Sequence, residues 1–146
     1  PLLLPFVKPW GKSDEKSAET TLNPWEDALR RLKEGNQRFM EERLRHPNEG
    51  SERRHQVAYE QHPFATIFTC SDSRGSPEII FDRGLSDLFV VRTAGHALDR
   101  AALGSIEYSI EYLEVPLVVV MGLERCGALK ATLEALQNHH RAPDAI

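Results

Sequence analysis

Residues 64–74, which read FATIFTCSDSR, join a short apolar run to a polar loop at Cys70. A second apolar run, LVVVM at residues 117–121, leads through the letters GLER to Cys126. Both runs are rich in β-branched residues and have the length of buried strands. Each cysteine is therefore expected shortly past the end of a strand, where an open α/β sheet places its ligands.

These two cysteines are the only ones in the chain, and their convergence at one edge of a sheet indicates a metal site built on thiolates. Cys126 also begins a predicted helix, whose N-terminus favours the ionised thiol. A catalytic zinc site with two cysteines needs a third protein ligand, often an imidazole. A natural place for that ligand, three residues before Cys126, holds Leu123. Two inert buried cysteines, or a redox pair without a metal, are the alternatives.

The remaining sequence alternates between helical and strand patterns. Helices are predicted over residues 23–40, 51–61, 77–81, 99–114 and 126–138, and strands over 64–69, 88–92 and 117–121. Apolar residues at helical spacing are expected on one face of helix 99–114 (Leu103, Ile106, Ile110, Leu113) and on the buried side of the last helix (Leu129, Leu133, Leu136). The order of elements predicts an α/β fold, in which a parallel sheet is flanked by helices.

Length and composition fit one domain with its own core. The chain has 146 residues, 40% of them hydrophobic, and a net charge of −4, which gives no electrostatic reason to expect a nucleic-acid partner. No apolar run approaches the roughly 20 residues that span a bilayer. Residues 1–22 are interpreted as an extended N-terminal arm and residues 23–146 as the domain. The sequence does not indicate a compartment.

Further candidates for the site lie next to the cysteines. Asp72 and Arg74 are two residues apart, so in an extended segment their side chains point the same way and can form an ion pair. Gly127, one residue into the last helix, suggests that something needs room beside Cys126. His96 is interpreted as a polar residue of the cleft and not as a ligand. A surface ion pair and an ordinary turn glycine are the plainer interpretations.

Several of these motifs together resemble the β-class carbonic anhydrases. The resemblance rests on CSDSR (70–74), RTAGH (92–96), GSIEY (104–108) and ERCGALK (124–130), and residues 28–39 are similar to the bacterial-type branch. It implies a zinc enzyme that interconverts CO2 and bicarbonate and acts as a homodimer or larger homo-oligomer. Cys70 and Cys126 match two zinc ligands of the family. Asp72 and Arg74 match its Asp–Arg dyad, whose Asp either orients the nucleophile or occupies the fourth metal position.

The sequence departs from the family pattern at the third zinc ligand. The family motif reads Gly-His-x-x-Cys-Gly, whereas residues 122–127 read GLERCG, so Leu123 replaces the histidine. We therefore expect zinc to be held by Cys70, Cys126 and Asp72, with Gly127 near the substrate and hydration of CO2 impaired. The alternative is a non-catalytic relative that serves as a scaffold or binds anions. We also expect that the family's usual C-terminal part is lacking.

Overall fold

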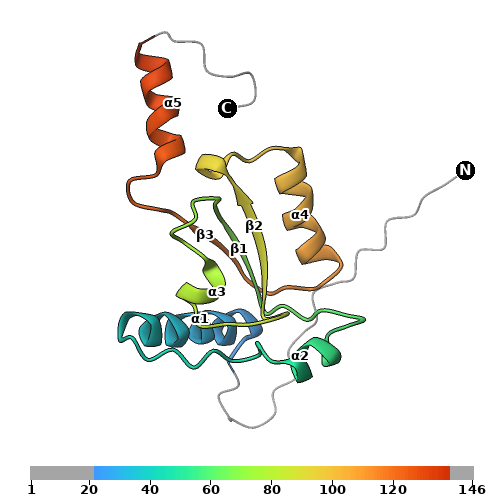
Figure 1. Ribbon diagram of the computed structural model, residues 1–146. Helices are drawn as coiled ribbons and strands as arrows, with labels where there is room; N and C mark the ends of the chain where they lie inside the picture. Colours follow the sequence, from blue (N-terminus) through green and yellow to red (C-terminus); the bar gives the residue numbers. More distant parts are fainter. Residues whose placement is uncertain (1–21, 139–146) are drawn as a thin grey trace, which may run out of the picture.

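The computed structural model describes residues 22–138. Its elements, in chain order, are α1 (Pro24–Met40), α2 (Ser51–Gln56), β1 (Ala65–Cys70), α3 (Pro77–Ile80), β2 (Leu88–Thr93), η1 (Ala94–His96), α4 (Arg100–Glu111), β3 (Val118–Met121) and α5 (Gly127–Gln137). The three strands form one parallel sheet in the order β2-β1-β3. Their carboxyl ends lie at the end of the molecule from which α5 projects (Figure 1). The predicted α/β fold, with a parallel sheet flanked by helices, is confirmed, and the predicted arm lies outside the described residues except for Leu22.

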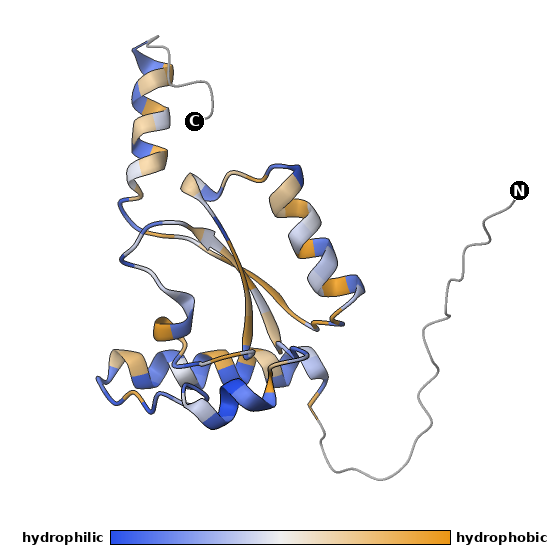
Figure 2. Ribbon diagram, turned by 45° about the vertical axis from the view of Figure 1, so that its right-hand side comes forward, coloured by the Kyte–Doolittle hydropathy of each residue, from blue (hydrophilic) through white to orange (hydrophobic). Residues whose placement is uncertain are grey.

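The central strand β1 separates two apolar layers, and all six of its residues are buried. Ala65 and Ile67 belong to the cluster that contains Ala28 and Leu32 of α1. Phe68 belongs to the opposite cluster, formed with β2 and α4. Figure 2 shows the hydrophobic strands between these helices, in contrast to the hydrophilic α2. Alternate residues of β1 therefore bind helices to both faces of the sheet.

The starts of the two long helices follow from their first residues. The carboxylate of Glu26 accepts a hydrogen bond of 2.8 Å from the backbone N–H of Asn23, as in a capping box, and Pro24 takes the first helical position. Asp99 caps α4 by accepting a hydrogen bond of 2.8 Å from the N–H of Ala102.

Within residues 22–138, none of the helices has the length and apolar character needed to span a membrane.

Some predicted boundaries are wrong. Strand β1 begins and ends one residue later than expected, so Cys70 is the last residue of the strand and does not follow it. Helix α2 ends at Gln56 instead of residue 61, because none of its side chains is buried and no packing extends it. Helix α4 ends at Glu111, three residues before the predicted end.

The predicted apolar faces of α4 and α5 are only partly correct. Ile106 packs against the sheet, but Leu103 and Ile110 are each 44% exposed. The buried positions of α4 are Ala102 and Ser109, whose small side chains let the helix approach the sheet. On α5 the predicted buried side is wrong within the described residues, where it stays exposed (Leu129, 46%; Leu133, 56%; Leu136, 69%). The apolar stripe on α5 was identified correctly, but the described residues do not cover it.

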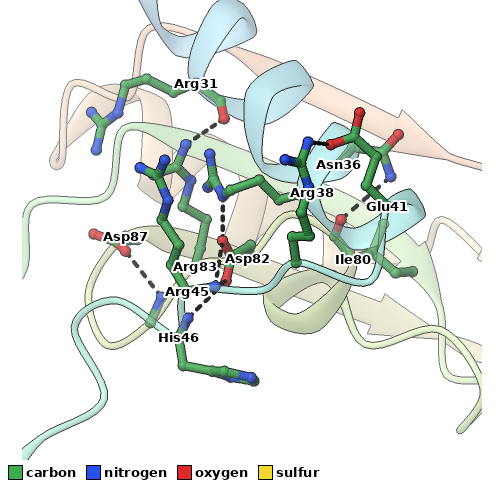
Figure 3. Close-up of polar contacts among 12 residues, drawn as sticks. Arg31, Asn36, Arg38, Glu41, Arg45, His46, Ile80, Asp82, Arg83 and Asp87 are labelled. Carbon is green, nitrogen blue, oxygen red and sulfur yellow. Dashed lines mark hydrogen bonds and ion pairs between the residues drawn. The ribbon is translucent and has the colours of Figure 1, made fainter.

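A buried carboxylate joins the end of α1 to the segment after α3. Asp82 is 2% exposed and accepts hydrogen bonds from Arg38 Nε (2.5 Å) and from the N–H groups of Arg45 (3.1 Å) and His46 (2.9 Å) (Figure 3). Burial raises the pKa of Asp82, but Arg38 and the two backbone donors outweigh it and hold that pKa below its usual value. The ionised carboxylate therefore contributes to stability.

Candidate metal centre

The two cysteines meet at the carboxyl edge of the sheet. Cys70 ends β1 and Cys126 directly precedes α5, and they are 4% and 5% exposed. Their sulfur atoms lie 3.6 Å apart, and both are free thiols. Zinc–sulfur bonds of about 2.3 Å in a tetrahedron place two sulfurs roughly 3.8 Å apart. The spacing therefore fits two adjacent positions of a zinc site.

The surroundings of Cys70 favour its thiolate. The N–H of Gly95 donates to its sulfur at 3.4 Å, and Gly95 has a φ of +62°, in the left-handed region that favours glycine. Burial raises the pKa of Cys70, but hydrogen bonds from the backbone of Asp72 and Gly95 and from Cys126 outweigh it, so that the pKa lies below its usual value. A lowered thiol pKa suits a metal ligand.

Asp72 and Arg74 form the predicted ion pair. Arg74 donates from Nε to Oδ1 of Asp72 (2.9 Å) and from its terminal nitrogen to Oδ2 (2.8 Å). The residues lie in a turn and not in an extended segment, because Oδ1 of Asp72 also accepts the N–H of Arg74 at 3.0 Å. The side-chain bonds from Arg74, followed by its backbone bond, lower the pKa of Asp72 to about 2. The carboxylate is therefore an ionised acceptor of fixed orientation.

Leu123 faces the same small cavity as Cys70 and Asp72. The cavity has a volume of about 50 Å³, and its other walls include Thr69, Gly75, Ile80, Met121 and Gly122. Among residues 22–138, no three His, Cys, Asp or Glu side chains are gathered closely enough to hold a metal. Asp72 is engaged with Arg74 instead, so its predicted role as a ligand requires the carboxylate to turn away from that guanidinium. The described residues thus provide two zinc ligands as they stand.

Two other candidates have different surroundings. A Cβ built on Gly127 would have no neighbour within 4 Å among the described residues, so nothing there requires a glycine. Its role in substrate binding stays a prediction. His96 donates from Nε2 to the carbonyl of Met121 at 2.8 Å. That bond agrees with the interpretation of His96 as a polar residue of the cleft.

Arg92 was missed as an individual residue in the sequence analysis. This half-buried residue of β2 donates from Nε to the carbonyl of Cys70 (3.0 Å) and from its terminal nitrogen to the carbonyl of Asp72 (2.6 Å). The signal available was its position, since Arg92 is a charged residue at the end of a β-branched run. Nothing in the letters showed which backbone groups it would reach.

Comparisons with known proteins match this arrangement. The family model described as carbonic anhydrase matches residues 65–146, more than half of the chain. The solved structure of the β-carbonic anhydrase CcaA superposes with a TM-score of 0.54 at 32% identity, covering 77% of this chain and 57% of that one. The chain belongs to the β-class carbonic anhydrases. The family resemblance inferred from the sequence is therefore confirmed.

Two further relatives define how far this β-carbonic anhydrase likeness extends. The carbonic anhydrase of Mycolicibacterium smegmatis is 55% identical over 109 residues, which are 75% of this chain and 53% of the relative. A tetrameric β-carbonic anhydrase of Sordaria macrospora matches with a TM-score of 0.50 and 28% identity, covering 56% of this chain and 47% of that chain. The chain spans about half the length of the curated relatives it matches.

Proposed function

We propose that the protein catalyses the reversible hydration of CO2 to bicarbonate, with zinc held by Cys70 and Cys126. The observation that carries this proposal is the 3.6 Å separation of the two thiol sulfurs beside the Asp72–Arg74 pair. When bound, zinc lowers the pKa of a coordinated water toward 7 and so supplies a nucleophile at neutral pH. The family membership of the chain supports the same reaction.

The residues of the chain have separate tasks in this proposal. Arg74 keeps Asp72 ionised. Only while it is not bound to the metal can Asp72 accept a hydrogen bond from the attacking water and orient it toward CO2. The small cavity lined by Cys70, Asp72 and Leu123 is the place where CO2 would approach the attacking water. The space beside Gly127 is open among the described residues, and we propose that bicarbonate is held there.

Leu123 makes the site weaker than a complete one. A leucine has no donor for a metal, so we propose that Asp72 supplies the third ligand. A carboxylate that binds the metal cannot stay paired with Arg74 and cannot orient the water. We therefore propose that zinc affinity and turnover are both lower than in a variant that has a histidine at position 123.

We also propose that the protein acts as a homodimer or a larger homo-oligomer. Leu129, Leu133 and Leu136 of α5 and Val120 of β3 are 46–69% exposed in the described chain, and apolar patches of this kind commonly mark interaction surfaces. The Sordaria macrospora relative is described as tetrameric. Sedimentation tests this point, since a monomer at micromolar concentration would contradict it.

Stopped-flow hydration of CO2 tests the catalytic proposal. The zinc-loaded protein should accelerate the reaction above the buffer rate, and Cys70→Ser should remove both the zinc and the acceleration. Stoichiometric zinc without acceleration would refute the activity but keep the metal site. Binding of anions without zinc would instead support the non-catalytic alternative.

A further inference from the structure

Arg92 connects β2 to the loop that carries both a thiol and the dyad carboxylate. In the parallel register of the sheet, Arg92 lies opposite Thr69, one residue before Cys70. Its guanidinium reaches past the strand end to the carbonyls of Cys70 and Asp72, at 3.0 and 2.6 Å. One side chain therefore fixes the backbone on both sides of Ser71.

The two carbonyls constrain the loop because the guanidinium is a rigid planar fork. Two peptide groups whose carbonyl oxygens accept hydrogen bonds from one planar guanidinium cannot rotate independently of each other. The direction of the Cys70 sulfur and that of the Asp72 carboxylate depend on this stretch of backbone. A lysine at the same position would keep the positive charge but lose the fork.

The same loop also sets the distance to the second cysteine. Arg74, which follows the turn, donates to the carbonyl of Arg125 at 3.3 Å, next to Cys126. A displacement of the 70–74 backbone would therefore move Asp72 and Arg74 together. It would also disturb the hydrogen bond between Arg74 and the carbonyl of Arg125, the residue before Cys126.

We propose that Arg92 is a positioning residue that holds Cys70 and Asp72 in the geometry needed for metal binding and CO2 hydration. The metal and activity parts of this inference rest on the proposed function. The constraint on the loop does not, since it follows from the two carbonyl bonds alone.

The test compares Arg92→Lys and Arg92→Met with a matched control, Arg53→Lys. Arg53 also donates through Nε to a backbone carbonyl, that of Leu85 at 3.0 Å, and is 25% exposed, but it lies outside the site. Loss of a residue that orients metal ligands lowers metal affinity or activity by about 10- to 100-fold. We expect this loss of Cd²⁺ affinity in both Arg92 variants and not in the control. The binding of Cd²⁺ is measured by the absorption of the cysteine thiolates that bind it.

Hydrogen exchange supplies a measurement that needs no metal. The N–H groups of Arg74 and Gly75 bond to Asp72, at 3.0 Å to its Oδ1 and 3.2 Å to its carbonyl. They should exchange at least roughly ten-fold faster in Arg92→Met, while the amides of α1 keep their protection. Uniformly faster exchange would mean a general loss of stability and would overturn the proposal.

The outcomes separate the two proposals. If the parent protein binds neither Cd²⁺ nor Zn²⁺, the proposed function fails and hydrogen exchange alone decides the role of Arg92. If Arg92→Lys matches the parent in both metal affinity and exchange, only the charge matters and the positioning role is wrong. Arg92→Lys is also made in a protein that already carries Asp72→Asn. If Arg92 acts on CO2 hydration through the Asp72 carboxylate, Arg92→Lys should cause no further loss of hydration there.

Discussion

Replacing Leu123 with histidine is expected to raise zinc affinity and CO2 hydration together. Leu123 faces the cavity that Cys70 and Asp72 also line, so an imidazole introduced there starts on the correct side of the site. Two thiolates and one imidazole complete a three-ligand catalytic site with one open position. Asp72 can then stay with Arg74 and orient the attacking water.

The expected change in stability follows from two opposing effects of Leu123→His, the loss of apolar burial and the gain of a zinc ligand. Removing the half-buried leucine costs roughly 1 kcal/mol of apolar burial. A third ligand should strengthen zinc binding at least about 100-fold, which corresponds to about 2.7 kcal/mol. Leu123→His should therefore unfold more easily than the parent without zinc. With zinc in excess, the order of stability should reverse.

Melting temperature and stopped-flow hydration, each with and without zinc, measure these effects. Leu85→His serves as a control, because Leu85 is 41% exposed and does not line the cavity. The control should gain neither zinc affinity nor activity. If Leu123→His also gains neither, the reasoning that places residue 123 at the third ligand position is refuted.

Three further predictions concern the cysteines, the buried carboxylate and pH. Cys126→Ser should abolish zinc binding whereas Ser71→Ala should retain it, and equal retention measured by elemental analysis would contradict the ligand assignment. Asp82→Ala should lower the free energy of unfolding by about 3–5 kcal/mol, measured in urea, because Arg38 loses its buried partner; a change below about 1 kcal/mol would contradict this role. Since the pKa of Asp82 is lowered on folding, its contribution is complete above its unfolded pKa of about 3.9 and is lost as the pH falls through the folded pKa. The stability difference between the parent and Asp82→Asn should therefore shrink below about pH 4, and a constant difference would show that ionisation is irrelevant.

The strands and the metal-site loop could be predicted from the sequence because their signals are local. A β-branched run such as residues 65–70 has few alternatives to a buried strand, and the structure confirms β1 with a shift of one residue. The Asp72–Arg74 pair depends on residues that are two apart. Its predicted existence was correct, although a turn, and not an extended segment, brings the side chains together.

The packing of α4 and α5 and the role of Arg92 could not be predicted, because they depend on contacts between segments distant in sequence. An apolar stripe such as Leu129–Leu133 on α5 shows that a surface favours burial, but it does not say which partner covers it. For α4, the small Ala102 and Ser109 face the sheet because they permit close approach, a packing effect that periodicity does not express. The bonds of Arg92 to two backbone carbonyls likewise join residues about twenty positions apart.

X-ray absorption at the zinc edge of the purified, metal-loaded protein tests whether Cys70 and Cys126 bind the metal. We expect one zinc per chain with two sulfur neighbours at about 2.3 Å and light-atom neighbours at the remaining positions. Leu123→His should keep the two sulfurs and add the outer-shell scattering of one imidazole. Zinc without two sulfur neighbours, or protein that takes up no zinc while Cys70 and Cys126 are reduced, would contradict the claim that these thiolates form a metal centre.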